Sequence, residues 1–129
     1  MSIETILKYK TIAVVGISDN PERPSHYLAS FLEKQGYNII PVNPNLQVWE
    51  GKKCYPDLRS IPFKVDVVDI FRRSEAVPPI VDEAIAINAK VVWMQEGIIN
   101  EEAAAKAKDA GIEVVMDMCM KIEYKRLKG

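Results

Sequence analysis

Cysteine and histidine are scarce in this sequence, and their scarcity excludes several classes of protein. The 129 residues include two cysteines, Cys54 and Cys119, and one histidine, His26. Two cysteines are too few for a disulfide framework, and they lack the pairs of short spacings that form a zinc site. A histidine-based metal site or catalytic triad would have to be built around His26 alone. We therefore expect reduced thiols and no bound metal.

Long apolar runs and an excess of charge are also missing. No apolar stretch approaches the ~20 residues that cross a bilayer, and the N-terminus lacks the basic and then apolar form of a signal peptide. The formal net charge is −1, with 17 Lys and Arg against 18 Asp and Glu, so there is no basic field for nucleic acid. We expect a cytoplasmic protein that binds neither nucleic acid nor a membrane.

Glycine is sparse where a dinucleotide-binding loop would need it. Gly16 is the only glycine before Gly36, whereas the dinucleotide fingerprint has three spaced glycines and an acidic residue about 20 residues further on. That acidic residue normally ends the second strand, and this chain has Asn43 at the corresponding place. These absences count against an NAD site.

What the sequence does contain is organised around the segment from Thr11 to Pro24. Five apolar or β-branched residues run unbroken into Gly16, and Pro24 opens a helical pattern that ends at Gly36. A continuous apolar run is typical of a strand buried on both faces of a parallel sheet. A glycine after it allows a sharp turn, and the first turn of the next helix offers free N–H groups at the same point. The segment predicts a phosphate site, although it is equally typical of an ordinary strand–turn–helix unit.

The rest of the chain alternates strands with helices, and its length and 48% hydrophobic content suit a single domain over residues 1–129. Further buried strands are expected over Asn38–Asn43, Val65–Phe71, Lys90–Met94 and Glu113–Met116. This pattern predicts an α/β protein, a Rossmann-like three-layer sandwich with a five-stranded parallel sheet and helices on both faces. We expect the strand order 3-2-1-4-5, with the ligand beyond the C-terminal strand ends, where the order reverses.

Helix caps and one long loop complete the expected fold. Ser2 and Asn100 are placed to cap helices, and the irregular segment over residues 45–62 is long enough to be functional. Trp49 is expected to anchor this segment rather than to stack on a ligand. His26 follows the loop and is expected to be a capping or surface residue, the alternative being a contact with the ligand. No pair of general acid and base emerges, so we predict no catalytic residue.

Cationic residues lie next to two of the expected elements. Arg72 and Arg73 come directly after the third strand, where a planar guanidinium suits the phosphate of a phosphorylated ribose. The alternative is that they pair with acids such as Asp69 or Glu75. Arg23 stands at the entrance of a helix, where it either reaches a pyrophosphate on the loop or is solvated.

Six short motifs occur in order from about Thr11 to Leu127, and together they resemble the small stand-alone CoA-binding proteins. The motifs are Val15–Ser18, Gly36–Tyr37, Pro41–Pro44, Asp69–Ser74, Trp93–Gly97 and a C-terminal segment that contains Asp117, Cys119, Glu123 and Leu127. The fold of that family resembles the nucleotide-binding domain of the succinyl-CoA ligase α subunit. The ligase also needs a domain with a phosphorylated histidine, and we do not expect such a domain in this protein.

The resemblance implies coenzyme A as the ligand and assigns its parts to the strand ends. It implies a pyrophosphate on the backbone of Gly16, Ile17 and Ser18 with help from Arg23, and a 3′-phosphate near Arg72 and Arg73. It also implies an adenosine against Asn43, Pro44, Phe71 and Arg72, and a pantetheine arm along Gln95 and Gly97.

Cys119 follows the fifth expected strand, at the start of a helix whose dipole favours a thiolate. Since the thiol of CoA is at the far end of the arm, we expect that oxidation can join the two sulfurs as a mixed disulfide. The alternative is a small buried thiol that fills space beneath the terminal helix.

Three functions are compatible with this sequence. The first is a non-enzymatic module that binds CoA or an acyl-CoA. The second is an enzyme, either a nicotinamide-dependent oxidoreductase or a ligase component. The third is a CoA-sensing regulatory domain that docks on a partner protein.

Overall fold

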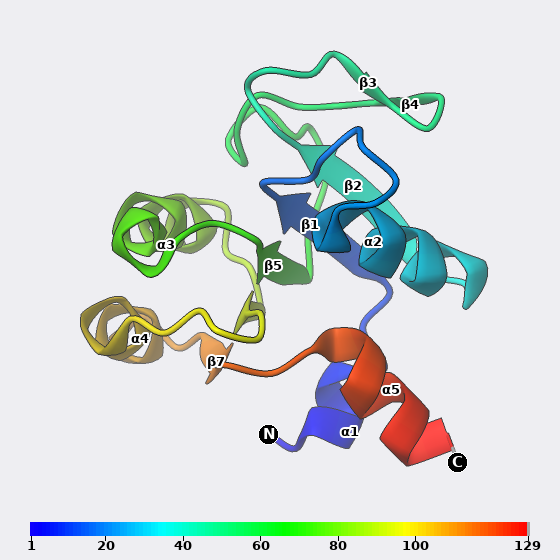
Figure 1. Cartoon of the computed structure of the whole chain (residues 1–129). Coiled ribbons are helices and arrows are strands. Elements are labelled where there is room, and N and C mark those ends of the chain that lie inside the picture. The colour runs from blue at the N-terminus through cyan, green and yellow to red at the C-terminus, as the bar shows by residue number, and fades with distance from the viewer. Residues whose placement is uncertain (129) are drawn as a thin grey trace.

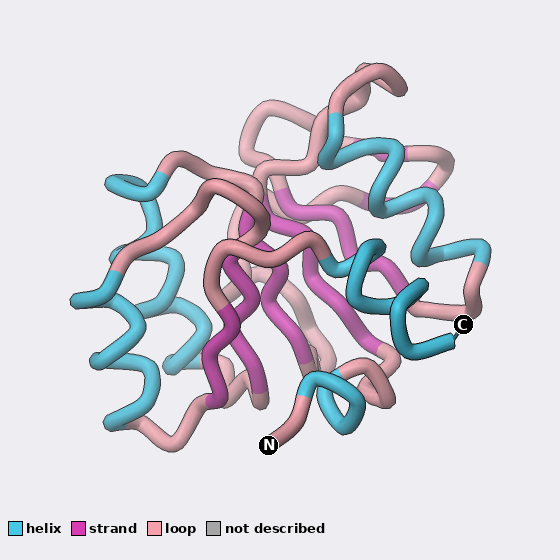
Figure 2. The backbone as a smooth tube through the Cα atoms, turned by 60° about the horizontal axis from the view of Figure 1, so that its bottom comes forward, coloured by secondary structure: helices cyan, strands magenta, loops and turns pink. Residues whose placement is uncertain are grey.

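The computed structural model describes residues 1–128, and it has a central sheet of five parallel strands between two layers of helices (Figures 1 and 2). The predicted α/β class, the five parallel strands and the helices on both faces are confirmed. The strands of the sheet are β1 (Thr11–Val15), β2 (Asn38–Val42), β5 (Val67–Ile70), β6 (Val91–Met94) and β7 (Glu113–Val115).

The order of the strands across the sheet is β2-β1-β5-β6-β7. Counted along the chain this order is 2-1-3-4-5, so the expected 3-2-1-4-5 is wrong in the position of the third strand, β5, which pairs with β1 rather than with β2. The outer side of β2 is bonded instead to Tyr55, whose N–H donates to the Pro41 oxygen at 3.0 Å. Proline has no N–H for a second ladder, so Pro41 indicates an edge strand. The order reverses between β1 and β5, and this is where a ligand is expected.

Each face of the sheet is covered by its own set of helices, because successive side chains of a strand point to opposite sides. Ile12 and Val14 of β1 face a layer made of α1 (Ile3–Ile6), α2 (Pro24–Lys34) and α5 (Met120–Lys128). The opposite face carries α3 (Val77–Ala86), preceded by the 3-10 turn η1 (Ser74–Ala76), and α4 (Glu101–Asp109). Figure 2 shows the two helical layers on either side of the strands.

The predicted helix caps are confirmed. The Thr5 N–H donates to Ser2 Oγ at 3.2 Å, and the Ala103 N–H donates to Asn100 Oδ1 at 2.9 Å. Pro24 is the first residue of α2, where its missing N–H costs no helical hydrogen bond.

The segment between β2 and β5 contains a small hairpin that we did not predict. It consists of β3 (Val48–Trp49) and β4 (Lys52–Lys53), which pair antiparallel. The turn residues Glu50 and Gly51 have φ values of 49° and 76°, and positive φ at both turn positions is characteristic of a type I′ hairpin turn. Trp49 is buried and anchors the segment, as predicted.

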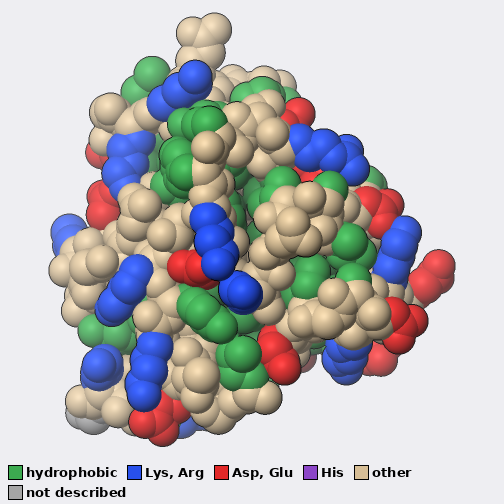
Figure 3. All heavy atoms as spheres, turned by 180° about the vertical axis from the view of Figure 1, so that it is seen from behind, with side chains coloured by type: hydrophobic (Ala, Val, Ile, Leu, Met, Phe, Trp, Pro, Cys, Tyr) green, Lys and Arg blue, Asp and Glu red, His purple; other side chains and the backbone are tan. Residues whose placement is uncertain are grey.

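Basic and acidic side chains are interspersed on the rear face of the molecule, with hydrophobic side chains between them (Figure 3). Among residues 1–128, no helix is long and apolar enough to span a bilayer.

Candidate functional site

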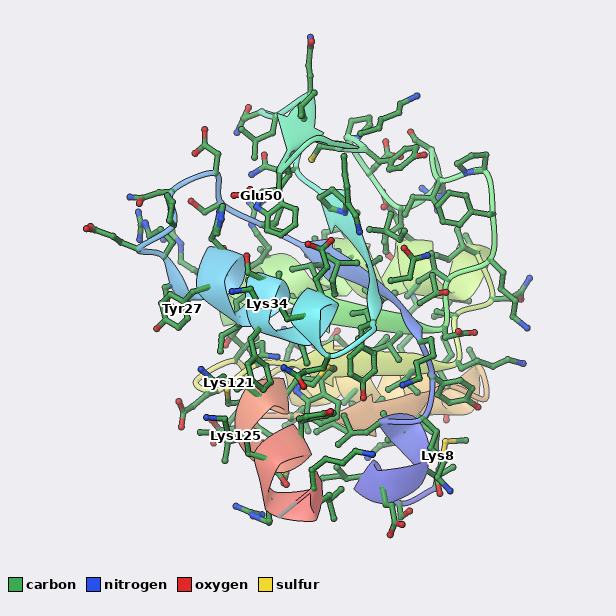
Figure 4. All side chains as sticks on the ribbon, turned by 90° about the vertical axis from the view of Figure 1, so that its right-hand side faces the viewer. Lys8, Tyr27, Lys34, Glu50, Lys121 and Lys125 are labelled. Atoms are coloured by element: carbon green, nitrogen blue, oxygen red, sulfur yellow. The ribbon has the colours of Figure 1, made fainter. Side chains whose placement is uncertain are left out.

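A cleft of about 1130 Å³ opens at the C-terminal ends of β1, β5 and β6, with α2 and α5 as its walls. Figure 4 shows Tyr27 at the start of α2 and Lys121 on the neighbouring helix α5, and both residues line this cleft. The lining includes every predicted site residue except Pro44, namely Gly16, Ile17, Ser18, Arg23, Asn43, Phe71, Arg72, Arg73, Gln95, Gly97 and Cys119. The structure therefore brings these residues together as the sequence predicted.

Pro44 lines a second, smaller hollow of about 280 Å³ on the α3 side of the sheet. Gly16 and Arg72 line both spaces. The two hollows therefore meet where the strand order reverses, and a ligand longer than either one can extend across that point.

Gly16 allows the ends of β1 and β5 to come together. Its φ is +88°, and a Cβ atom at this position would lie 2.6 Å from the carbonyl oxygen of Phe71 and 2.7 Å from Cδ of Arg72. A contact of that length with a backbone oxygen cannot be relieved by turning a side chain. Any other residue would push the two strand ends apart.

The loop after β1 offers fewer backbone donors than we expected. The Gly16 N–H donates to the Val42 oxygen at 3.0 Å, and the Ser18 N–H donates to Ser25 Oγ at 2.9 Å. Within residues 1–128, the N–H groups of Ile17 and Asp19 donate to no protein acceptor. Ile17 is fully buried whereas Asp19 is exposed, so the Asp19 N–H is the one that a phosphate on this loop would reach without competing with existing hydrogen bonds.

Four cationic side chains border the cleft. In the part of the chain that the structure describes, Arg23 and Arg72 form no salt bridge, whereas Arg73 Nε lies 3.7 Å from Glu75 Oε1. The Arg73 side chain is 90% exposed, so this pair contributes little to stability. Lys121 completes the set from α5, and sequence reasoning missed it because its distance from the strand ends depends on how α5 docks.

Asn43 connects the end of β2 to the loop after β1. Its Nδ2 donates to the Ile17 oxygen at 2.7 Å, and its Oδ1 accepts the N–H of Asn45 at 2.8 Å. The amide is thus already hydrogen-bonded within the protein. The expected contact of Asn43 with adenosine stays a prediction.

Gln95 is hydrogen-bonded to a buried carboxylate. Its Nε2 donates to Asp69 Oδ1 at 2.8 Å, and Asp69 and Gln95 are only 1% and 4% exposed. Burial raises the pKa of Asp69 from its ordinary value to about 7, although the hydrogen bond from Gln95 opposes that shift. The alternative in which Asp69 pairs with an arginine is therefore wrong.

The loops after β6 and β7 are joined beside Cys119. The Gly97 N–H donates to Asp117 Oδ1 at 2.6 Å. Cys119 is partly exposed and immediately precedes α5, so the position that we expected for this thiol at the cleft is confirmed. Its disulfide with CoA stays a prediction.

His26 belongs to a buried network that the sequence did not reveal. The expectation of a capping or surface residue is wrong, because His26 is 5% exposed, with Nδ1 2.8 Å from the Ser18 oxygen and Nε2 2.8 Å from Glu50 Oε1. Trp49 Nε1 donates to the same Ser18 oxygen at 3.0 Å. The network fastens the β3–β4 hairpin to the loop after β1, and no local sequence pattern predicts such a long-range contact.

The fold is a Rossmann-like α/β domain, and its candidate ligand site is the cleft at the C-terminal edge of the parallel sheet, where cationic side chains and a close backbone approach suit a nucleotide. The family model described as "CoA binding domain" matches residues 10–125. The chain therefore belongs to this family of CoA-binding domains.

Two relatives match almost the whole chain. The uncharacterised protein YneT of Bacillus subtilis is 41% identical over 121 residues, which cover 94% of this chain and 90% of that protein. The solved structure of a hypothetical protein from Pyrococcus horikoshii has a TM-score of 0.95 and 41% identity, covering 100% of this chain and 94% of the other.

Larger enzymes share the domain. The ADP-forming acetate–CoA ligase II of Archaeoglobus fulgidus is 34% identical over 101 residues, which cover 77% of this chain but only 15% of the ligase. The dinucleotide-forming acetyl-coenzyme A synthetase 1 of Candidatus Korarchaeum cryptofilum has a TM-score of 0.76 and 27% identity over 88% of this chain and 27% of its own. This chain is thus homologous to a small part of each of these enzymes.

Proposed function

We propose that the protein binds coenzyme A or an acyl-CoA in the cleft and does not itself transform it. The observation that carries this proposal is the cleft where the strand order reverses, bordered by Arg23, Arg72, Arg73 and Lys121, in a chain that belongs to the CoA-binding domain family. CoA carries several negatively charged phosphates, and arginine is well suited to bind them.

The two connected hollows support an extended ligand. The smaller one, lined by Pro44 and Arg72, suits the adenosine end, and the loop after β1 suits the pyrophosphate. The pantetheine arm would then follow the larger cleft past Gln95 and Gly97 toward Cys119. Pro44 and Arg72 would then lie beside the adenosine, as the resemblance implied, whereas Asn43 and Phe71 line the larger cleft.

A binding role is supported by the placement of the one histidine. His26 is buried behind the loop after β1, where its two ring nitrogens face Ser18 and Glu50.

A role as part of a ligase is the second candidate, because this chain is homologous to part of two enzymes whose names include CoA ligation or synthesis.

Calorimetric titration with CoA, 3′-dephospho-CoA and NAD tests the proposal. We expect CoA to bind about tenfold or more tightly than dephospho-CoA, because a hydrogen bond to a charged group contributes ~1.5 to 3 kcal/mol. NAD should bind least, since Asn43 cannot supply the usual carboxylate contact to its ribose. Equal affinity for the three ligands would refute the assignment.

The substitution Arg72→Ala is expected to weaken CoA binding by roughly 10- to 150-fold and to leave dephospho-CoA binding almost unchanged. Arg73→Ala should have the smaller effect, because Arg73 is highly exposed and already lies near Glu75. Lys108→Ala on α4, outside the cleft, serves as the matched loss of one positive charge and should affect neither ligand. If neither arginine substitution separates the two ligands, the arginines do not recognise the 3′-phosphate.

A further inference from the structure

The side-chain oxygen of Gln95 is presented to the cleft. Only 4% of Gln95 is exposed, yet the residue lines the cleft. Its Nε2 donates a hydrogen bond to Asp69. Within residues 1–128, Gln95 Oε1 accepts no hydrogen bond from the protein, and no fully buried side-chain oxygen or nitrogen is left without a partner. Oε1 must therefore be the atom of Gln95 that remains accessible from the cleft.

The partner of Gln95 fixes which end of the amide faces outward. In the structure the NH₂ group of Gln95 faces Asp69 and donates to its Oδ1. When Asp69 is ionised it only accepts hydrogen bonds, so turning the amide over would then bring two oxygens together in a buried environment. Asp69 thus holds Gln95 with its oxygen toward the cleft.

The position of this pair indicates a purpose beyond packing. Asp69 lies opposite Trp93 on the neighbouring strand, and Gln95 follows two residues later on the same side of the sheet. The surrounding positions on this face are filled by apolar residues such as Val67 and Val91. A buried carboxylate is costly where an apolar residue would pack without a penalty, so its presence beneath a cleft points to a role in binding.

We propose that Asp69 is a positioning residue that holds Gln95 Oε1 as the acceptor for an amide N–H of the ligand's pantetheine arm. The inference rests on the proposed function, because it is the arm of CoA that carries secondary amides. The inference adds a chemical reason why the cleft would select that arm. Gln95 Oε1 is an acceptor, so the part of the ligand beside it must carry a hydrogen-bond donor.

Two probes separate the arm from the nucleotide. CoA carries both parts, whereas adenosine 3′,5′-bisphosphate carries the nucleotide without the arm. Gln95→Met, which removes the acceptor at nearly constant volume, should weaken CoA binding about fivefold and leave the bisphosphate unchanged. Asp69→Leu should weaken CoA binding at least twofold, because a free amide presents its oxygen only part of the time, and should also leave the bisphosphate unchanged.

The double variant tests whether Asp69 acts through Gln95. In the Gln95→Met background, Asp69→Leu should cause no further loss of CoA affinity, since no amide remains to be oriented. A loss by the same factor in both backgrounds would overturn the proposal. So would an equal loss for both probes, because a structural defect would not distinguish the arm from the nucleotide.

The wild-type titrations keep this inference separate from the proposed function. If the wild type binds neither probe, the proposed function fails and this inference fails with it. If the wild type binds both probes equally tightly, the nucleotide site stands and the contact with the arm is refuted. Gln95→Met leaves Asp69 buried without its partner; should it fail to fold, Asp69→Leu alone still decides the question across the two probes.

Discussion

Asp69→Asn is expected to increase the free energy of unfolding by up to roughly 4 kcal/mol at pH 8 and by little at pH 4. The pKa of Asp69 is raised by burial from 3.8 to about 7, so the folded protein disfavours the ionised form. The wild type therefore loses stability as the pH rises from about 4 to 7. Asparagine has the same size, carries no charge and still accepts the Gln95 hydrogen bond, so the variant avoids this loss. Urea unfolding of both proteins across this pH range measures the difference.

The control for this experiment is Asp109→Asn, which removes an exposed carboxylate at the end of α4. Its effect should remain within about 0.5 kcal/mol at every pH, as for most surface substitutions. Other carboxylates titrate in all three proteins and cancel in the comparison. Parallel stability curves for the wild type and Asp69→Asn would show that the Asp69 carboxyl is not destabilised by burial.

Gly16→Ala is expected to reduce the free energy of unfolding by roughly 3 kcal/mol or more. The added Cβ would meet the Phe71 carbonyl oxygen at 2.6 Å, and the φ of +88° is unfavourable for any residue with a side chain. The conformational strain costs about 1 to 2 kcal/mol and the forced contact about 1 to 3 kcal/mol. Denaturant unfolding without ligand measures the sum, because β1 and β5 must separate to accommodate the methyl group.

Gly36→Ala is the matched control, since Gly36 also has a positive φ, +98°, but a Cβ there would have no atom within 4 Å. It should cost only the conformational strain, about 1 to 2 kcal/mol. The difference between the two variants isolates the close approach of β1 and β5. Equal losses for both variants would mean that the strand ends can move apart at little cost.

Local patterns in the sequence were sufficient for the elements of the fold. The apolar run into Gly16 marked β1 to within two residues, and Pro24 and Gly36 marked the two ends of α2. These signals act over neighbouring residues, through side-chain periodicity, the fixed φ of proline and the freedom of glycine. All the predicted site residues except Pro44 line the cleft, whereas other lining residues, such as Tyr27 of α2 and Lys121 of α5, were not predicted.

The position of β5 in the sheet did not follow from these local patterns. Both orders allow right-handed crossovers, so handedness did not choose between them. Pro41 carried the missing information, because a strand with a proline in its interior suits the edge of a sheet and not its middle. The structure fills that edge with Tyr55, from a segment that the sequence suggested only as an irregular loop.

The sequence by itself determined the α/β class, the five buried strands and the set of residues at their C-terminal ends, because the period of apolar residues and the turn-forming residues are local properties. Only the tertiary structure decided that β5 lies beside β1, that His26 bonds to Glu50 across the loop, and that Asp69 holds Gln95 beneath the cleft. Asp69 and Gln95 are 26 positions apart. Contacts of this kind depend on how whole strands and helices pack, and burial of the Asp69 carboxylate follows from that packing alone.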